Sequence, residues 1–285
     1  MLNIVQEEKT IQFYFEEYIK NGDRKKLIKS LIPILSSKTL VMHVAAPKSG
    51  STWFDKIMQE TRKFKFATLI EDYGRREQEI QLEVFIKNII DVNERVYFKH
   101  QHIRVSQYVI EFIHCFGIKV IFQIRNIFDI VYSVRDHFVN ESISGPGVYV
   151  TTEYFNFSEE KQFDMIIDLA MPWFFNFFAG WFEYIKNNQN ENLYILTYEN
   201  LKQNTSEELK KIFRFLNFDD FTDNKIEEVL LMAEKNPNLI RKNKAISGRG
   251  KDLTDNQRNR ILKMAGYYPD IDFSLIGIDN KDKIL

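Results

Sequence analysis

The segment TLVMHVAAPKSGSTW, residues 39–53, constrains the fold of this chain more than any other segment. It opens with an apolar, β-rich run at 39–46, which predicts a buried strand. A loop with Lys48, Gly50 and several hydroxyl residues follows, and helical spacing begins at Ser51. After a parallel strand, the N–H groups of such a turn and of the next helix point at one spot, where the helix dipole favours an anion. The segment therefore predicts an α/β fold with an anion-binding loop.

Strand and helix patterns alternate along the rest of the chain. Apolar runs predict further strands at 95–100, 118–125 and 192–198. Helical spacing predicts helices at 6–20, 24–36 (ending near Pro33), 51–62, 105–116, 127–139 and 161–187. This alternation favours a central parallel sheet flanked by helices on both faces. We expect one α/β domain over residues 1–285, with N-terminal helices in residues 1–38.

Four shorter segments carry further signals. Residues 141–160 contain Gly-Pro-Gly and no clear period, which predicts a long loop or lid. The sequences TSEE (205–208) and TDNQ (254–257) fit the capping-box pattern and predict two helix starts. The aromatic stretch 171–184 predicts a buried helix, mostly core, with some side chains lining an apolar acceptor pocket.

The composition excludes several classes of protein. The 285 residues include 39 basic and 40 acidic side chains, so no global field attracts nucleic acid or an anionic membrane. The single cysteine, Cys115, excludes an internal disulfide and a cysteine-based metal site. The chain shows neither a signal-peptide pattern nor a run of about 18 apolar residues. We therefore expect a cytoplasmic protein that binds neither nucleic acid nor membrane.

The loop after the first strand has the chemistry of a phosphate site. Gly50 lets the backbone approach a ligand, Lys48 adds a charge, and three hydroxyl residues, Ser49, Ser51 and Thr52, add donors. A Walker A loop places its Lys after the second Gly, whereas Lys48 precedes the only Gly here. An ordinary P-loop kinase is therefore disfavoured. A strand–helix turn with incidental polar residues stays open as an alternative.

With Pro47 and Trp53 included, the loop PKSGSTW resembles the 5′-phosphosulfate loop of the sulfotransferases that use 3′-phosphoadenosine 5′-phosphosulfate (PAPS). The family loop usually reads PKSGTTW. Further family motifs follow in the expected order, within about residues 40–265. IRNIFDIVYS resembles the 3′-phosphate segment, and this resemblance assigns that phosphate to Arg125 and Ser133. LYILTYENLK resembles the segment that sets Tyr198 against the adenine.

A basic segment near the C-terminus, LIRKNKAISGRGKD, resembles the family loop that clamps the 3′-phosphate. Asn243 replaces the usual Gly of this loop, and Gly250 replaces its Trp. The resemblance as a whole implies a donor site formed by Lys48, Ser49, Gly50, Ser51, Thr52, Trp53, Arg125, Ser133, Tyr198, Arg241, Lys242 and Asn243.

The family's catalytic base is a His in a Lys-Thr-His segment after a strand. This chain has YFKHQHIRVS, with two histidines near the end of the strand at 95–100. The spacing from His102 to Arg125 suits the family better, so His102 is the expected base and His100 the alternative. Lys48 is expected to neutralise charge on the leaving phosphate. We expect no metal, because no ligand spacing accompanies the two histidines.

The resemblance implies a sulfotransferase that moves the sulfuryl group of PAPS to a hydroxyl or amine of a small-molecule acceptor. The product of the donor would be 3′-phosphoadenosine 5′-phosphate (PAP). By analogy, natural-product tailoring suits a stand-alone domain of this kind. A P-loop kinase-like phosphotransferase and a non-catalytic PAP-binding module stay as alternatives. A homo-oligomer is not predicted, because the family's downstream dimerisation motif is not intact.

Overall fold

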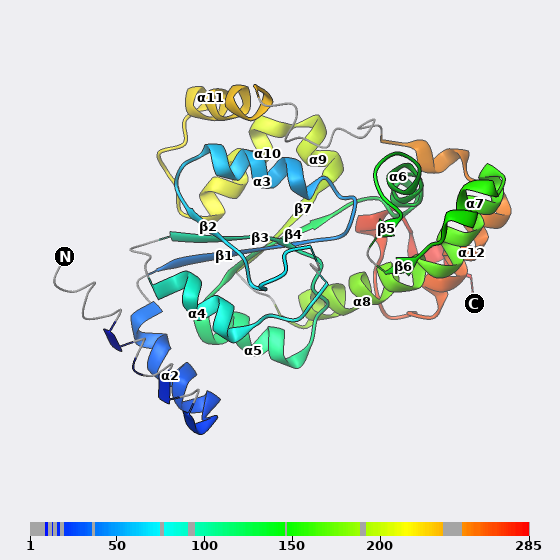
Figure 1. The fold of residues 1–285 in the computed structure, drawn as a ribbon. Coiled ribbons are helices and arrows are strands. Elements are labelled where there is room, and N and C mark those ends of the chain that lie inside the picture. Colours follow the sequence, from blue (N-terminus) through cyan, green and yellow to red (C-terminus); the bar gives the residue numbers. More distant parts are fainter. Residues whose placement is uncertain are drawn as a thin grey trace.

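The computed structural model describes residues 9–10, 13, 16–17, 20–35, 38–74, 77–90, 95–145, 147–188, 192–235 and 247–284. Within them, a central sheet of five parallel strands has the order β2-β3-β1-β4-β7 (Figure 1). Its strands are β1 (Thr39–Ala45), β2 (Lys65–Ala67), β3 (Arg95–Gln101), β4 (Lys119–Ile124) and β7 (Leu193–Thr197). The parallel α/β sheet that the sequence predicts is therefore confirmed.

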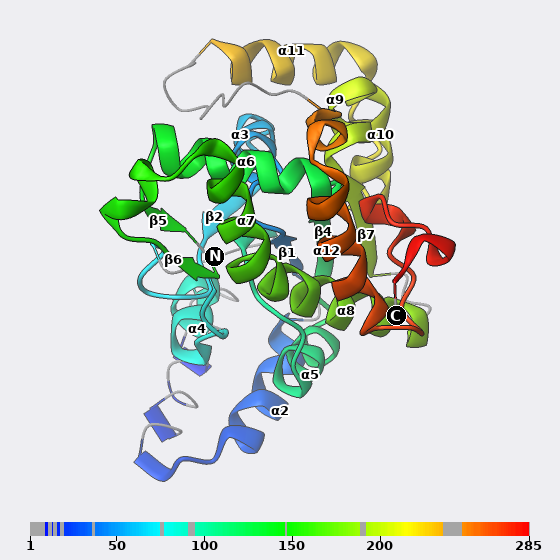
Figure 2. The same cartoon turned by 90° about the vertical axis from the view of Figure 1, so that its right-hand side faces the viewer.

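Helices cover both faces of the sheet (Figure 1). One face carries α3 (Ser51–Glu60), α9 (Tyr198–Gln203), α10 (Thr205–Phe215) and α11 (Asp223–Glu234). The other face carries α2 (Arg24–Leu35), α4 (Leu82–Ile90), α5 (Gln107–Phe116) and α8 (Met171–Asn187). At the carboxyl ends of the strands lie α6 (Ile127–Asn140), α7 (Glu159–Leu169) and α12 (Asp255–Gly266), which are in front in Figure 2.

The alternation of side chains along the strands divides the core between the two faces. Val41 and Tyr97 face α3 and pack with Phe54 of that helix. Phe122 of β4 points to the opposite face, where its ring stacks on Trp181 of α8 at a centroid distance of 5.2 Å. Burying each such apolar side chain contributes roughly 1.5–3 kcal/mol, so both helical layers are held firmly to the sheet.

Strand β3 contains one extra residue where it pairs with β1. Met42 is opposite Phe98 and Val44 is opposite Gln101, so the register shifts by one residue between the two pairs. A bulge of this kind turns the following side chains toward the other face of the sheet. Unbroken alternation would place His100 on the face of Phe98, whereas the bulge turns it toward α3. The bulge therefore determines which groups surround the histidine segment.

One predicted helix is divided into two in the structure. The predicted helix 161–187 is two helices, α7 and α8, bent by 40° at Ala170. The break places Pro172 in the first turn of α8, where its missing N–H costs nothing. The predicted helix 24–36 agrees with α2, which continues through Pro33 to Leu35. Most of the predicted helix 6–20 lies outside the described residues.

The capping predictions have opposite outcomes. The predicted helix start at 205–208 is confirmed, but the box itself is wrong, because α10 starts at Thr205 after Asn204 and no side chain caps it. At the start of α12, Thr254 and Gln257 form the predicted reciprocal box. No single helix in the described part of the chain is long and apolar enough to cross a bilayer. The bent pair α7–α8 passes that test by length and composition alone.

The predicted loop at 141–160 has its own secondary structure. It contains the hairpin β5 (Ser144–Gly145) and β6 (Val148–Tyr149), followed by a 3₁₀ helix, η1 (Thr152–Asn156). Helix α7 starts inside the predicted range, at Glu159. The segment is therefore a structured connection between α6 and α7.

Candidate active site

The loop between β1 and α3 adopts a tight turn at the carboxyl edge of the sheet. Lys48 and Gly50 both have left-handed backbone angles, with φ of 64° and 85°. A Cβ atom on Gly50 would lie 2.8 Å from the Tyr198 ring, so only glycine fits against this tyrosine. The Ser49 hydroxyl donates to the Ala46 carbonyl at 2.6 Å, which closes the turn. The loop is thus held in one conformation at the start of α3.

The remaining loop residues form the first turn of α3. Ser51 is buried there, and Thr52 and Trp53 are partly buried. The N–H of Trp53 donates back to the Gly50 carbonyl at 3.1 Å. This is the strand–loop–helix arrangement in which unsatisfied N–H groups of a helix N-terminus bind an anion.

Lys48 extends toward the end of α6. Its ammonium group lies 3.4 Å from a carboxylate oxygen of Glu141, which also contacts His137 at 3.0 Å. Burial raises the pKa of Glu141, but Lys48 and His137 outweigh that effect and hold the pKa below its usual range. An anionic ligand in the loop would compete with Glu141 for the Lys48 ammonium.

Arg125 and Tyr198, which lie far apart in the sequence, meet at this loop. Arg125 follows β4 and donates to the Lys48 carbonyl at 3.0 Å. Its guanidinium lies over the Tyr198 ring at 4.3 Å, and both side chains are buried. Burial raises the pKa of Tyr198, so its hydroxyl stays protonated at neutral pH. The structure thus brings the predicted phosphate and adenine residues together at the loop.

Helix α6 connects this loop to the C-terminal segment. The predicted phosphate residue Ser133 is buried in α6. Asp129, in the first turn of α6, accepts the N–H groups of Gly248 and Gly250 at 2.7 and 2.8 Å. Sequence reasoning missed Asp129 as the residue that anchors the C-terminal loop. The predicted clamp residues Arg241, Lys242 and Asn243 lie outside the described residues.

Gly250 is sterically required where the family pattern has a Trp. A Cβ atom at this position would lie 2.3 Å from the Cβ atom of Phe128. Next to it, Arg249 forms an ion pair with Asp136, a second acidic residue of α6. The opposite charges of Arg249 and Asp136 are the sequence signal that could have indicated this anchor.

His102 has the hydrogen bond expected of a neutral base. Its Nδ1 atom lies 2.7 Å from the carbonyl oxygen of Ala45, at the end of β1. Because a carbonyl oxygen only accepts, Nδ1 carries a proton, so in a neutral His102 ring the lone pair would be on Nε2. The His102 side chain is 7% exposed and follows directly on β3. The structure therefore places this histidine beside the strand that leads into the loop, with Nδ1 hydrogen-bonded to that strand.

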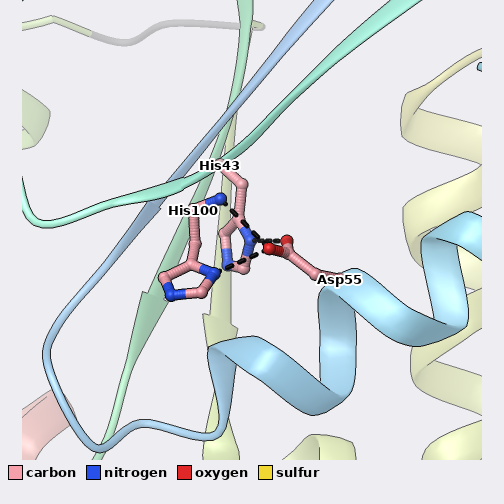
Figure 3. Close-up of side chains that lie close together, drawn as sticks. All are labelled: His43, Asp55 and His100. Atoms are coloured by element: carbon pink, nitrogen blue, oxygen red, sulfur yellow. Dashed lines mark hydrogen bonds and ion pairs between the residues drawn. The ribbon is translucent and has the colours of Figure 1, made fainter. Parts of the chain in front are cut away.

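His100 has a different environment, which sequence reasoning missed. Its Nδ1 atom lies 2.6 Å from a carboxylate oxygen of Asp55 in α3, and Asp55 also contacts His43 of β1 (Figure 3). The rings of His100 and His102 are 5.5 Å apart between centroids. Among the described residues, His43, Asp55 and His100 have ligand atoms within 4.8 Å of one another. The sequence argument that these histidines lack nearby ligands is therefore wrong for His100.

A family model described as a sulfotransferase domain matches residues 38–273 of the chain. The chain belongs to the sulfotransferase family. The matched residues include the range 40–265 that carries the sequence motifs. The predicted family and enzyme class are thus confirmed.

Two solved structures have a similar fold. A mouse sulfotransferase, SULT7A1, complexed with PAP, gives a TM-score of 0.59 at 16% identity, covering 87% of this chain and 92% of that one. A retinol dehydratase in complex with androsterone and the inactive cofactor PAP gives a TM-score of 0.51 at 13% identity, covering 85% of each chain. No curated protein sequence matches this sulfotransferase. At such identities, the two structures confirm the fold.

Proposed function

We propose that this sulfotransferase moves the sulfuryl group of PAPS to a hydroxyl or amine of a small-molecule acceptor. The observation that carries the proposal is the meeting of Arg125 and Tyr198 at the loop that starts α3. A cation, an aromatic ring and a helix N-terminus are there together, as a nucleotide with several phosphates requires. Family membership supports the reaction, and the PAP in both similar structures supports the donor.

The sulfuryl donor PAPS would be held at both of its ends. The 5′-phosphosulfate would occupy the loop, with Lys48 moving from Glu141 to the phosphate and residues 49–52 supplying N–H and hydroxyl donors. Arg125 and Ser133 are assigned by resemblance to the 3′-phosphate and Tyr198 to the adenine. The clamp residues Arg241, Lys242 and Asn243 keep their predicted role as a proposal.

The transfer step needs a base, a leaving group and in-line geometry. The acceptor oxygen or nitrogen forms a bond to sulfur while the bond from sulfur to the 5′-phosphate oxygen breaks, and that electron pair leaves with PAP. His102 Nε2 takes the acceptor proton, and the hydrogen bond from its Nδ1 to the Ala45 carbonyl steadies the resulting imidazolium. Lys48 neutralises the charge that develops on the leaving phosphate. No step of this scheme needs a metal ion.

Finer assignments belong to the same proposal. A small-molecule acceptor fits the family, and natural-product tailoring rests on analogy. A cytoplasmic location and one domain over residues 1–285 remain predictions. The kinase-like alternative is disfavoured by the family match and by the place of Lys48 before Gly50. A non-catalytic PAP-binding module differs from the proposed enzyme only in turnover.

A transfer assay tests the proposal. Purified protein would be incubated with sulfur-labelled PAPS and a panel of phenols, alcohols and amines, in the presence of a chelator. We expect labelled product with at least one acceptor class, and loss of that product in the Lys48→Met variant. Binding of PAP without turnover on any acceptor would favour the non-catalytic module. Transfer from ATP–Mg²⁺ in place of PAPS would favour the phosphotransferase.

A further inference from the structure

The Asp55 carboxylate collects hydrogen-bond donors from two strands. Its Oδ1 atom lies 2.7 Å from His43 Nδ1 on β1 and accepts the Tyr97 hydroxyl of β3 at 2.9 Å. Its Oδ2 atom lies 2.6 Å from His100 Nδ1 and accepts the His100 backbone N–H at 3.3 Å (Figure 3). The Asp55 side chain is only 13% exposed, so few of these bonds are exchanged for bonds to water. One carboxylate thus joins α3, β1 and β3.

The same network continues to the loop between β1 and α3, residues 46–50, which we call the donor loop because PAPS is proposed to bind there. His43 Nε2 lies 2.9 Å from the side-chain oxygen of Gln123 on β4, and the Gln123 amide nitrogen donates to the Ser49 carbonyl at 2.7 Å. Turning this amide over would place its oxygen against the Ser49 carbonyl oxygen, so the orientation is determined by its partners. A continuous set of buried hydrogen bonds therefore links the histidine segment to the loop.

The partners of both ring nitrogens of His43 can accept hydrogen bonds. Its Nδ1 faces a carboxylate and its Nε2 faces an amide oxygen, and both of these groups are acceptors. His43 is fully buried beside the Asp55 carboxylate, and a ring with a proton on each nitrogen, an imidazolium, would donate to both of these acceptors. Burial alone would raise the pKa of Asp55, but His100 and His43 outweigh it and hold that pKa well below its usual range.

We propose that Asp55 and His43 form a charge-paired positioning unit that fixes the donor loop against the strand end that carries His100 and His102. The inference rests on the proposed function, which makes the loop the donor site and His102 the base. Asp55 acts through His100 on one side and through His43 and Gln123 on the other. The unit holds sulfur and base in line, so its loss lowers turnover more than donor affinity.

The same three residues have the composition of a metal site, and the geometry favours the hydrogen-bonded pair. Each histidine nitrogen lies 2.6–2.7 Å from a different oxygen of Asp55, as in a charged hydrogen bond. Tyr97 and the His100 backbone N–H use the same two oxygens. The carboxylate therefore has its full set of donors without an ion.

Protonation states test the unit without any activity. Long-range ¹H–¹⁵N spectra distinguish imidazolium, Nδ1–H and Nε2–H rings, and the chain has five histidines to assign by substitution. At neutral pH we expect both nitrogens of His43 to be protonated and His102 to be protonated at Nδ1 alone. In Asp55→Asn, the imidazolium signature of His43 is expected to disappear. A neutral His43 in the unaltered protein would overturn the charge pair.

Kinetics test the positioning role. In Asp55→Asn we expect turnover of PAPS on the best acceptor of the panel, or PAPS hydrolysis to PAP and sulfate, to fall ~30-fold. The dissociation constant of PAP measured by calorimetry is expected to stay within ~3-fold. Tyr97→Phe removes one donor to the same carboxylate without changing charge, and we expect a loss of ~3-fold. An equal loss in turnover and in PAP affinity would contradict positioning and indicate a general loosening of the loop.

Two further measurements distinguish a positioning defect from misfolding and from metal binding. If Asp55→Asn does not fold, the double variant His43→Gln, Asp55→Asn removes both charges and is expected to fold with the same turnover defect. Normal turnover in that double variant would overturn the proposal. One equivalent of a transition metal in the purified protein, lost in Asp55→Asn, would overturn it in favour of a metal site. Failure of the unaltered protein to bind PAP would refute the donor site, while the spectra would still decide the charge pair.

Discussion

The donor loop and the histidine segment occupy neighbouring strand ends, after β1 and β3, but they are built differently. The loop at 46–50 has its chemistry in consecutive residues, and distant residues such as Arg125 only support it. The histidine segment has two residues of the same type, His100 and His102, and only their distant partners give them different environments. His102 meets a backbone carbonyl, whereas His100 meets the carboxylate of Asp55. The role of a local motif can be recognised from the sequence. A role that depends on distant partners can be recognised only once the fold is known.

The largest expected effect is the loss of turnover on substitution of Lys48 in the donor loop. In Lys48→Met, the charge on the leaving phosphate loses its counter-charge, and we expect turnover of PAPS to fall ~10²–10³-fold. PAP affinity, measured by calorimetry, is expected to fall much less, because residues 49–52 still supply N–H donors. A loss of turnover below ~10-fold would contradict the role of Lys48.

The histidine side is tested by a matched set of substitutions. In His102→Ala we expect a ~10²-fold loss of turnover, because the proton acceptor is removed. His100→Asn keeps a donor for Asp55 in place of Nδ1, and we expect a loss of less than ~5-fold. His100→Ala removes that donor and is expected to lie between the two. If His100→Asn were the most damaging of the three, His100 would be the base and the assignment would reverse.

Substitution of Gly250 tests whether the C-terminal loop, residues 247–252, contributes to the PAPS site. In Gly250→Ala, the new Cβ atom meets Phe128, and we expect the free energy of unfolding to fall by about 1–3 kcal/mol. PAP affinity is expected to fall with it. Gly180→Ala is the control, because its Cβ atom would lie 3.5 Å from Val105 and helical alanine is favourable. Equal melting temperatures for the two variants would contradict the packing of Gly250.

The smallest expected effect concerns the ion pair between Lys48 and Glu141. The pKa of Glu141 is lowered in the folded chain, so its carboxylate adds stability above the usual carboxyl pKa of about 4.3 and loses that contribution as the pH falls. In Glu141→Gln we expect a loss below ~1 kcal/mol at pH 7, since the pair is partly solvated. Melting curves from pH 7 to pH 3 should converge for the two proteins. A difference that grows toward low pH would contradict this account.

The sequence allowed the fold and the donor loop to be predicted for the same physical reason. Apolar periodicity indicates strands and helices, and PKSGST carries its own turn chemistry, with Gly50 at a positive φ. The bulge in β3 leaves no such signal, because neither Lys99 nor His100 is unusual in a strand. The contact between His100 and Asp55, 45 positions apart, depends on that bulge and on the packing of α3. The sequence does not reveal the bend at Ala170, because the apolar pattern continues through it.

The central claim is that the loop from Lys48 to Trp53 binds the 5′-phosphosulfate end of PAPS. Thermal unfolding of the protein with PAP, and separately with ATP–Mg²⁺, tests it most directly. At about 100 times its dissociation constant, PAP should add roughly 2.7 kcal/mol to the free energy of unfolding and raise the melting temperature by a few degrees. We expect this shift with PAP, and a much smaller shift with ATP–Mg²⁺. A shift with ATP–Mg²⁺ and none with PAP would contradict it.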